Sequence, residues 1–547
     1  MEKTMTDETF NLVDRPWIRV RMLDGSTREL SLMDVFARAN EVETLANDIV
    51  TQDVAILRML LAVLLRVVTL DVDVDADPID VWGELWDASE LPMEAIGAYL
   101  SKWRHRFDLF DDEAPFMQTA GIERKNPDAE TGLSPLILDQ PDKRRLFSMR
   151  SGTGLERMSF QEAARWLVNV HAFDVSGIKF GFKGGRNTDG TDAAPSSRSP
   201  AIGVSWAGNI GNLIIEGRNL RETMLLNLVL WNPSEQDDLL AYENDAPAWE
   251  QPPSPPGNEV RVPLGPMDLL TWQGRRVLLA HDGDMVIDAL VTNGSKVDGL
   301  DMRDFENMTA WTTKSRNDDT CKPKAHTTDE AFWHGLAAYV QSKDYDSTDR
   351  MRSSNNMVWV RALLDEGRLP RNVPIRMHAV GVEYTAKSTK IQDVIDDTLS
   401  MSSYLLSQEG EPLREMVLRC IDVTKNATNA YKRLAEELQM AKGAKEDQAK
   451  KQAARECASA CFDIDMMFET WVCQLNPETD ERTAETDWQR QVMRTLRRMA
   501  NVLMRNAGSN ALIGRYAKYG KKKRLFNATK SEDIFYARLR SYLSLAK

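Results

Sequence analysis

The feature that most constrains the fold is a series of amphipathic helical patterns in the last third of the chain. From about Tyr384 onward, apolar residues recur at spacings of three and four, which is the period of an α-helix with one buried face. Short breaks at Gly443, Asn476-Pro477 and Gly508 separate the patterns. Because such helices must bury their apolar stripes against one another, we expect residues 379–547 to form an antiparallel four-helix bundle.

Residues 1–378 have a different character, because strand-like and helix-like patterns alternate there. Asp24-Gly25, between alternating apolar stretches, predicts a β-hairpin within residues 10–33. Val54–Leu70 predicts a buried helix, since it is slightly short for a membrane span and contains two arginines. Leu269–Leu279 is strand-like, and Met357–Leu364 is helical. The sequence therefore predicts an α+β protein, with a large mixed α/β N-terminal domain followed by the helical bundle.

Charge and cysteine content limit the class of protein. The net charge of −14 argues against a surface that is basic throughout, so any contact with nucleic acid must be local. Five cysteines are few and odd in number, which suits a reducing compartment better than a disulfide framework. We therefore expect a cytoplasmic protein that does not enter the membrane.

Motifs for catalysis are mostly absent. The chain contains no phosphate-binding G-x-x-x-x-G-K-[ST], no zinc-protease H-E-x-x-H and no nucleophile elbow. His281-Asp282 is the kind of pair that metal-dependent phosphohydrolases use, but a turn between two strands explains it better. Cys457 and Cys461 lie four residues apart on one helical face, where core cysteines are the favoured interpretation over a zinc site that needs four ligands. We expect no enzyme activity, metal or cofactor.

The stretch Phe173–Gly185 (FDVSGIKFGFKGG) is the first candidate for a binding site. It contains four glycines and two lysines, Lys179 and Lys183, and no acid after Asp174. Glycine allows close approach of a backbone to a ligand, and lysine supplies a charge for phosphate. From residue types alone, a nucleic-acid contact and a tight turn with solvated lysines both remain open, and the turn is favoured.

Two basic clusters reverse the charge locally. Lys143-Arg144-Arg145 lies in a long polar loop between Gly121 and Met158. Arg515–Lys530 holds seven basic residues and no acid, with aromatic residues interleaved; its principal cations are Arg515, Lys518, Lys521, Lys522, Lys523 and Arg524. Lysine and arginine bind phosphates without sequence preference, and aromatic rings stack on unpaired bases. A solvated connector before the last helix is an equal alternative for the second cluster.

A set of separated segments resembles one known family. The segments are NLVDRPWIRVR (Asn11–Arg21), APFMQT (Ala114–Thr119), AFDVSGIK (Ala172–Lys179), WAGNIGNLIIEGRNLRETMLLNLVLW (Trp206–Trp231), LLTWQGRRVLL (Leu269–Leu279) and VGVEYTAKSTKIQD (Val380–Asp393). Their order and spacing resemble the CasA family, the large subunit of the type I-E CRISPR surveillance complex (Cascade), in a form similar to the actinobacterial branch. The resemblance spans nearly the whole chain.

This resemblance implies a function that is not catalytic. The family's large subunit reads the protospacer-adjacent motif in double-stranded DNA, largely through the minor groove, and wedges the duplex open so that guide RNA can pair and an R-loop can start. It also recruits the helicase–nuclease. The implied partners are therefore target DNA, the subunits of Cascade that bear guide RNA, and the CRISPR helicase–nuclease.

The resemblance also implies which residues carry the function. The family's glycine loop matches Ser176, Gly177, Ile178 and Lys179, and its wedge tip matches Ala386, Lys387, Ser388 and Thr389. A lysine that reaches the motif from the strand region falls near Lys296, and the loop that reaches toward the RNA matches Gly121–Met158. Some members carry glutamine at the wedge tip, where this chain has Lys387-Ser388, and some carry a cysteine cluster that this chain lacks.

Two alternatives from other classes stay open. The first is a metal-dependent nuclease or phosphohydrolase that uses His281-Asp282. The second is a structural scaffold whose bundle packs on sister subunits.

Overall fold

A computed structural model describes residues 10–546, apart from residues 74, 127–131, 139–155, 188, 197, 200, 233–234, 240–241, 243, 314–319, 329, 341–350 and 372. The chain divides into two compact units. The first unit consists of Met1–Glu330, Thr348–Leu363 and Arg376–Thr398, and the second consists of Ala331–Ser347, Leu364–Ile375 and Leu399–Lys547.

The first unit mixes helices with several small sheets. Its helices are α1 (Leu32–Ala37), α2 (Val50–Asp71), α3 (Pro78–Asp87), α4 (Met93–Trp103), α5 (Phe160–Phe173), α6 (Leu220–Leu226), α7 (Pro266–Leu270) and most of α8 (Asn355–Asp365). Its strands up to the middle of the chain are β1 (Ile18–Met22), β2 (Thr27–Leu30), β3 (Val42–Leu45), β4 (Ile122–Arg124), β5 (Met158–Ser159), β6 (Lys179–Phe180), β7 (Phe182–Gly184), β8 (Arg198–Ser199), β9 (Asn212–Glu216), β10 (Trp231–Asn232) and β11 (Glu235–Leu239). The later strands are β12 (Glu259–Arg261), β13 (Arg275–Asp282), β14 (Met285–Asn293), β15 (Ser295–Val297), β16 (Trp311–Thr313), β17 (Cys321–Pro323), β18 (Met351–Arg352) and most of β19 (Pro374–Tyr384) and of β20 (Ile391–Ser402).

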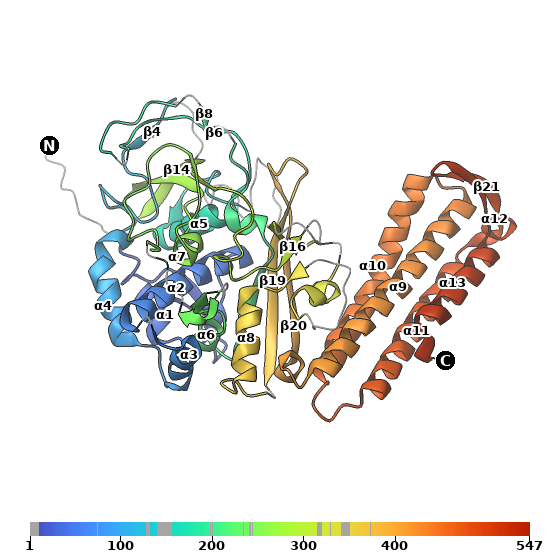
Figure 1. Cartoon of the computed structure of the whole chain (residues 1–547). Helices are drawn as coiled ribbons and strands as arrows, with labels where there is room; N and C mark the ends of the chain where they lie inside the picture. Colours follow the sequence, from blue (N-terminus) through green and yellow to red (C-terminus); the bar gives the residue numbers. More distant parts are fainter. Residues whose placement is uncertain are drawn as a thin grey trace. The chain divides into compact units, whose positions relative to one another are not determined.

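Helix α2 forms the centre of this unit, which confirms the prediction of a buried helix. Side chains around its whole circumference are buried, and it runs through the middle of the unit beside α5 and α7 (Figure 1). Even Arg58 is buried, and its guanidinium donates to the carboxylate of Glu306 at 2.8 and 3.0 Å. Trp206 Nε1 donates to the same carboxylate at 2.7 Å. Burial alone would raise the pKa of Glu306, but the charge of Arg58 outweighs it and lowers this pKa.

The long strands β19 and β20 belong to a three-stranded sheet in the order β20-β19-β9. Strand β9 pairs antiparallel with β19, from Arg376 opposite Glu216 to Val380 opposite Asn212. Side chains also link the three strands, because Nδ1 of His378 in β19 lies 2.8 Å from Glu216 in β9 and its Nε2 lies 2.8 Å from Asp396 in β20. The turn between β19 and β20 projects from the end of the two strands (Figure 1).

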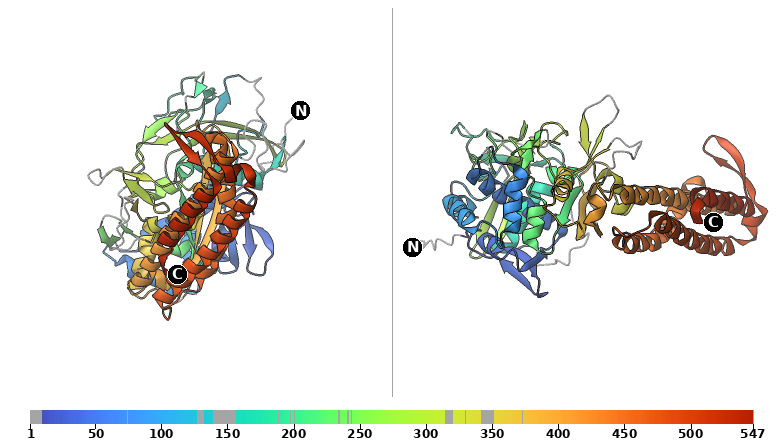
Figure 2. Two further views of the ribbon diagram at one scale, coloured as in Figure 1. Left: turned by 90° about the vertical axis from the view of Figure 1, so that its right-hand side faces the viewer. Right: turned by 60° about the horizontal axis from the view of Figure 1, so that its bottom comes forward.

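The second unit is dominated by long helices. It contains α9 (Glu411–Lys442), α10 (Glu446–Cys473), α11 (Glu481–Arg505), α12 (Gly508–Ile513), α13 (Ala528–Tyr542) and the strands β21 (Arg515–Tyr519) and β22 (Lys522–Phe526). Helices α9, α10, α11 and α13 pack together along their lengths (Figure 2). Neighbouring helices are antiparallel. Between α10 and α11, for example, Asp463 contacts Arg498 and the later residue Met467 contacts the earlier residue Thr495. The predicted antiparallel four-helix bundle is therefore confirmed.

Several local predictions are also confirmed, and two are wrong. The hairpin β1–β2 turns at Asp24-Gly25, and α8 covers the predicted helical residues. The helical character predicted from about Tyr384 is wrong for β20, because Ile391, Ile395 and Leu399 are spaced by four yet lie in a strand. The predicted strand Leu269–Leu279 contains the end of α7 and only the first part of β13. Within the described residues, no helix combines the length and the apolar content that crossing a membrane requires.

Candidate nucleic-acid interface

The predicted glycine loop, Ser176–Lys179, follows directly after α5. The N-cap of that helix is Ser159, whose side chain accepts from the amide of Glu162, and its C-cap is Asp174. The carboxylate of Asp174 is buried and forms an ion pair with Lys179 Nζ at 2.7 Å and another with Arg275. Burial alone would raise the pKa of Asp174, but these two cations outweigh it and lower the pKa. The loop therefore starts from a charged cluster that lies below the surface.

Buried side chains of β13 and β14 fix the backbone of the loop. The guanidinium of Arg275, which is fully buried, donates to the carbonyls of Asp174 at 3.1 Å, Val175 at 2.9 Å and Gly203 at 3.1 Å. The side-chain amide of Asn293 donates to the carbonyl of Gly177 at 3.1 Å. Because these contacts are to main-chain oxygens, they hold the loop in place without using its side chains.

The loop presents apolar side chains outward and turns its lysine inward. Ile178 is 64% exposed and Phe180 is 44% exposed, whereas the side chain of Lys179 is only 16% exposed. Desolvation lowers the pKa of Lys179, and the pairing with Asp174 opposes this shift. In this structure Lys179 is therefore an internal counter-ion and not the free phosphate contact that its residue type indicates. The side chain of the neighbouring lysine, Lys183, is 45% exposed and pairs with the exposed Glu123 at 2.8 Å.

The predicted wedge is the turn between β19 and β20, residues 385–390. The amide of Ser388 donates to Thr385 O at 2.6 Å, and the amide of Thr385 donates to Lys390 O at 2.9 Å. Ser388 has a φ of +53°, a conformation that few residues other than glycine and asparagine adopt readily. Ala386, Lys387 and Thr389 are exposed at the tip.

The structure brings the glycine loop and the wedge turn together, although they are about 200 residues apart in the sequence. The main-chain amide of Ser176 donates to the main-chain carbonyl of Ser388 at 2.8 Å. At the base of the turn, Tyr384 Oη donates to the carbonyl of Phe173 at 2.7 Å. The turn is therefore tied both to the loop and to the last residue of α5.

A cleft of about 470 Å³ lies beside this junction. Its walls include the glycine loop, Thr389 of the wedge turn, Leu138 and Val291. Lys387, unlike Lys179, is exposed, and no ion pair is recorded for it within the described residues. Lys387 is therefore the cation of these two segments that is open to an external phosphate.

Lys296 lies in β15, which pairs parallel with β12. It is exposed at the rim of a second cleft, of about 390 Å³, whose walls include Trp206 and Trp272. No contact of Lys296 with the glycine loop or the wedge turn is recorded in the described structure, so its role in motif reading stays a prediction.

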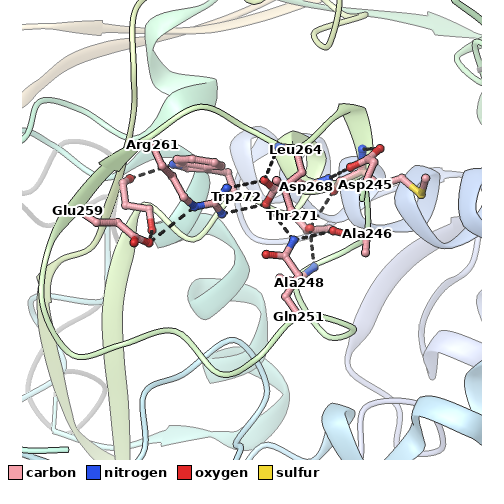
Figure 3. A network of polar contacts seen from close by, with 12 residues as sticks. Asp245, Ala246, Ala248, Gln251, Glu259, Arg261, Leu264, Asp268, Thr271 and Trp272 are labelled. Atoms are coloured by element: carbon pink, nitrogen blue, oxygen red, sulfur yellow. Dashed lines mark hydrogen bonds and ion pairs between the residues drawn. The ribbon is translucent and has the colours of Figure 1, made fainter. Parts of the chain in front are cut away.

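A polar network supports the strand pair that carries Lys296 (Figure 3). The guanidinium of Arg261 lies 4.1 Å from the ring centre of Trp272 and donates to the carboxylate of Asp268 at 2.5 and 2.9 Å. Asp245 accepts from the amide of Asp268 at 2.9 Å, and burial raises the pKa of Asp245 to about 6. Glu259 accepts from Ser295 Oγ at 2.7 Å, which links β12 to β15 by side chains as well. The strand pair that carries Lys296 is thus held by side-chain contacts as well as by its backbone pairing.

The other predicted basic residues are divided between two places. Lys143, Arg144 and Arg145 lie outside the described residues. The cluster that begins at Arg515 is not a connector but the hairpin β21–β22, in which Arg515 pairs with Phe526 and Tyr519 with Lys522. The hairpin lies at one end of the second unit, beside α12 (Figure 1).

The residues considered for metal chemistry gain no support from the structure. His281-Asp282 is exposed at the end of β13; His281 Nδ1 lies 3.1 Å from Gly283 O, and Asp282 pairs with Arg157 at 2.5 Å. Among the described residues, no group of three His, Cys, Asp or Glu side chains is arranged to hold a metal ion. Cys457 and Cys461 are half-buried rather than fully in the core, with 3.8 Å between their sulfurs.

Comparison with known proteins decides the family. The family model described as CRISPR-associated protein Cse1 matches residues 11–499, which is most of the chain. The chain belongs to the Cse1 family. A curated Cse1 relative, the CRISPR-associated protein CasA/Cse1 of Thermus thermophilus, is 27% identical over 436 residues, covering 79% of this chain and 78% of the relative. The predicted membership of this family is thereby confirmed.

Solved structures agree with this assignment. The crystal structure of Cse1 from Thermobifida fusca has a TM-score of 0.84 and 32% identity to this Cse1-family chain, with 98% of this chain and 99% of that chain covered. A chain from a CRISPR RNA-guided surveillance complex has a TM-score of 0.65 and 18% identity, with 90% of this chain and 99% of that chain covered. The latter likeness is one of fold alone.

The sequence did not reveal the residues that position the loop in this Cse1-family chain. Arg275 and Asn293 lie about 100 residues after the loop that they hold. One signal was available, because Arg275-Arg276 interrupts an otherwise apolar run, and arginines within a predicted buried strand require internal acceptors.

Proposed function

We propose that this chain is the non-catalytic large subunit of a CRISPR RNA-guided surveillance complex of the Cascade type. In this role it recognises a short protospacer-adjacent motif in double-stranded DNA through the minor groove and starts the opening of the duplex. Membership of the Cse1 family and the similarity to a chain of a surveillance complex support this proposal. Sister subunits that hold guide RNA, target DNA and a helicase–nuclease that is recruited afterwards are the partners in this proposal.

The observation that carries the proposal is the main-chain hydrogen bond between Ser176 and Ser388. It joins a loop suited to groove contact to a turn suited to strand separation. A shift of the loop by bound DNA is therefore passed directly to the turn, because the two segments share a bond and not only a surface. Recognition and opening become one event in this geometry.

The loop has the chemistry that a minor-groove contact requires. The position where a Cβ of residue 177 would lie is open, with no heavy atom within 4 Å, so the backbone of Gly177 is accessible from outside. Exposed Ile178 and Phe180 flank it and offer apolar contact with sugars and base edges. The minor groove distinguishes base pairs only coarsely, which suits a reader that accepts more than one motif.

A small free-energy contribution from the protein at the start of duplex opening is enough to decide the outcome. Unstacking one base step costs a few kcal/mol. Later pairing of guide RNA with the target strand replaces a DNA duplex of nearly equal stability, so the first step decides whether the exchange proceeds. Exposed Lys387 at the turn supplies a cation for a phosphate at the point of separation.

The test uses the assembled complex and a duplex that carries the motif. Gly177→Asp places a carboxylate in open space, so the fold is unaffected while the negative charge repels the phosphates. We expect at least tenfold weaker binding. Gly257→Asp is the matched control, because its Cβ position is also open and it adds the same charge elsewhere. Lys387→Ala should weaken binding and reduce the salt dependence of log K by about 0.9, the value for one phosphate contact.

Equal affinity of the Gly177→Asp and Gly257→Asp complexes for the duplex would contradict the assignment of the loop. Normal DNA binding by all loop and turn variants, with failure of assembly by bundle variants, would instead favour a scaffold. Cleavage of DNA by the isolated chain with magnesium or manganese, lost in His281→Ala, would favour a nuclease.

A further inference from the structure

The hairpin β21–β22 has two faces with different partners. Successive residues of a strand point to opposite sides, so Tyr516 and Lys518 share a side with Lys523 and Leu525, which lie opposite them in the register. We call this side the outer face. The other side, with Tyr519, Arg524 and Phe526, faces the long helices of the bundle.

Contacts within the unit hold the inner side of the hairpin on the bundle. The guanidinium of Arg524 lies 4.3 Å from the ring centre of Tyr519 and 3.6 Å from the carboxylate of Glu437 in α9. The amide of Gly520 in the turn donates to Glu446 of α10 at 2.8 Å. Arg515 reaches the C-terminal end of α9, because a Cβ on the C-cap Gly443 would collide with its guanidinium. These contacts fix the hairpin on α9 and α10.

The outer face takes no part in these contacts. Tyr516 is 66% exposed, and Leu525 beside it is 39% exposed. Lys518 and Lys523 stand next to each other across the two strands, and Lys521 follows at the turn. No ion pair is recorded for any of these three lysines within the described part of the chain. In a protein with a net charge of −14, three lysines without a recorded ion pair on an already anchored hairpin are suited to binding an anion.

We propose that the outer face of the β21–β22 hairpin binds single-stranded DNA, with the lysines on successive phosphates and Tyr516 stacked on an unpaired base. Cations beside an exposed aromatic ring are the usual combination for a single strand, since phosphates take the charge and any base offers a π-face. Duplex reading by a β-ribbon in the major groove uses arginine, lysine, asparagine or glutamine against base edges. Among these types the outer face has only lysine, and its exposed tyrosine ring favours an unpaired base instead.

The source of the strand rests on the proposed function. Opening a duplex so that one strand pairs with guide RNA leaves the other DNA strand unpaired. The hairpin would bind that displaced strand, which opposes closure of the duplex. The hairpin itself and the loop–turn junction belong to different units of the chain, so the two sites are tested separately.

The first experiment measures the binding of fluorescently labelled oligo-dT, of about 20 nucleotides, to the purified full chain over a range of salt concentrations. Lys518→Ala with Lys523→Ala should reduce the slope of log K against log salt by about 1.4, since each single-strand phosphate contact contributes about 0.7. Lys432→Ala with Arg482→Ala removes the same charge from exposed positions on α9 and α11 and serves as the control.

The second experiment tests the base contact. Tyr516→Ala should weaken oligo-dT binding about tenfold, whereas Tyr516→Phe should bind like the unaltered chain, because the phenyl ring retains the stacking. Polyglutamate, a duplex of the same length and oligo-U serve as competitors. An acidic protein surface as the true partner predicts that polyglutamate competes as well as oligo-dT and that Tyr516→Ala has no specific effect on DNA. Stronger competition by oligo-U than by oligo-dT would assign the site to RNA.

A third measurement needs no variant of the chain. Oligonucleotides containing 5-bromouracil should crosslink to Tyr516 on irradiation, as identified by mass spectrometry. Crosslinks only at other positions, or an unchanged salt slope in the hairpin variants, overturn the proposal. Gly177→Asp should leave oligo-dT binding by the full chain unchanged, and the hairpin variants should leave motif recognition by the complex unchanged, so failure of one site is distinguishable from failure of the other.

Discussion

Replacement of Gly208 by alanine tests how the wedge turn is held. Gly208 lies in the turn of 3₁₀-helix at Trp206–Asn209, and a Cβ there would lie 3.1 Å from Tyr384 Cζ and far closer to Tyr384 Oη than non-bonded atoms approach. Tyr384 must therefore move, and the hydrogen bond from its hydroxyl to Phe173 O is lost or distorted. Overpacking of this kind costs about 1–3 kcal/mol of the free energy of unfolding.

A double-mutant cycle separates the steric clash from other effects. Tyr384→Phe alone removes one hydrogen bond and should cost about 1 kcal/mol. In the Tyr384→Phe background the clashing oxygen is absent, so Gly208→Ala should cost at least about 1 kcal/mol less than it does in the unaltered chain.

Urea denaturation followed by tryptophan fluorescence measures the four free energies of unfolding. In the assembled complex, Gly208→Ala should also weaken binding of the motif-bearing duplex, and Tyr384→Phe should restore part of that binding. Additive effects of the two changes, within about 0.5 kcal/mol, would show that the packing of Gly208 against Tyr384 does not control the turn.

Three further predictions concern charged groups. Burial alone lowers the pKa of His378, but its hydrogen bonds to Asp396 and Glu216 outweigh this and raise the pKa to about 9. The protonated histidine therefore stabilises the fold fully below about pH 6.5, and this stabilisation is lost as the pH rises through 9. Between pH 6 and pH 10 the free energy of unfolding should fall by about 2–3 kcal/mol, and His378→Gln should abolish that difference in denaturation experiments. Asp174→Asn leaves Lys179 and Arg275 without their buried counter-charge, so the free energy of unfolding in urea should fall by about 3–5 kcal/mol. Lys183→Ala breaks the exposed pair with Glu123 and should lower it by less than about 1 kcal/mol. Similar losses in the two variants would contradict the buried role of Asp174. Glu306→Gln leaves Arg58 buried without an anion, so it should lower the free energy of unfolding by about 3–5 kcal/mol and the thermal midpoint with it. Glu250→Gln is the control with a smaller expected loss, because its partner Arg66 is partly exposed.

Local patterns predicted the elements whose burial follows from their own sequence. The apolar run that became α2 and the stripes on α9 and α11 are examples, because one face or the whole surface of each helix is apolar over many turns. Strand β20 was mistaken for a helix because its apolar residues are spaced by four, and pairing with β19 determines its conformation. The pairing partner is set by tertiary structure, which no local pattern contains.

The candidate site was predicted from the resemblance, and the structure adds the contacts between its parts. The family motifs identified Ser176–Lys179 and Ala386–Thr389, but the bond between the two segments depends on how α5, β13 and β19 pack. The inward orientation of Lys179 follows from the burial of Asp174 beside Arg275, which lies 101 residues further along the chain. For the same reason, the basic hairpin could not be divided from sequence into an anchored side and an open side.

The bond between Ser176 and Ser388 uses no side-chain atom, and this has a consequence for how the site changes over evolutionary time. Any residue except proline supplies the amide at position 176, and position 388 requires only tolerance of a positive φ. Substitutions of side chains at the tip, such as that of Lys387, therefore leave this hydrogen bond intact. A lineage can therefore exchange the side chains of both segments while the hydrogen bond between their backbones is inherited unchanged.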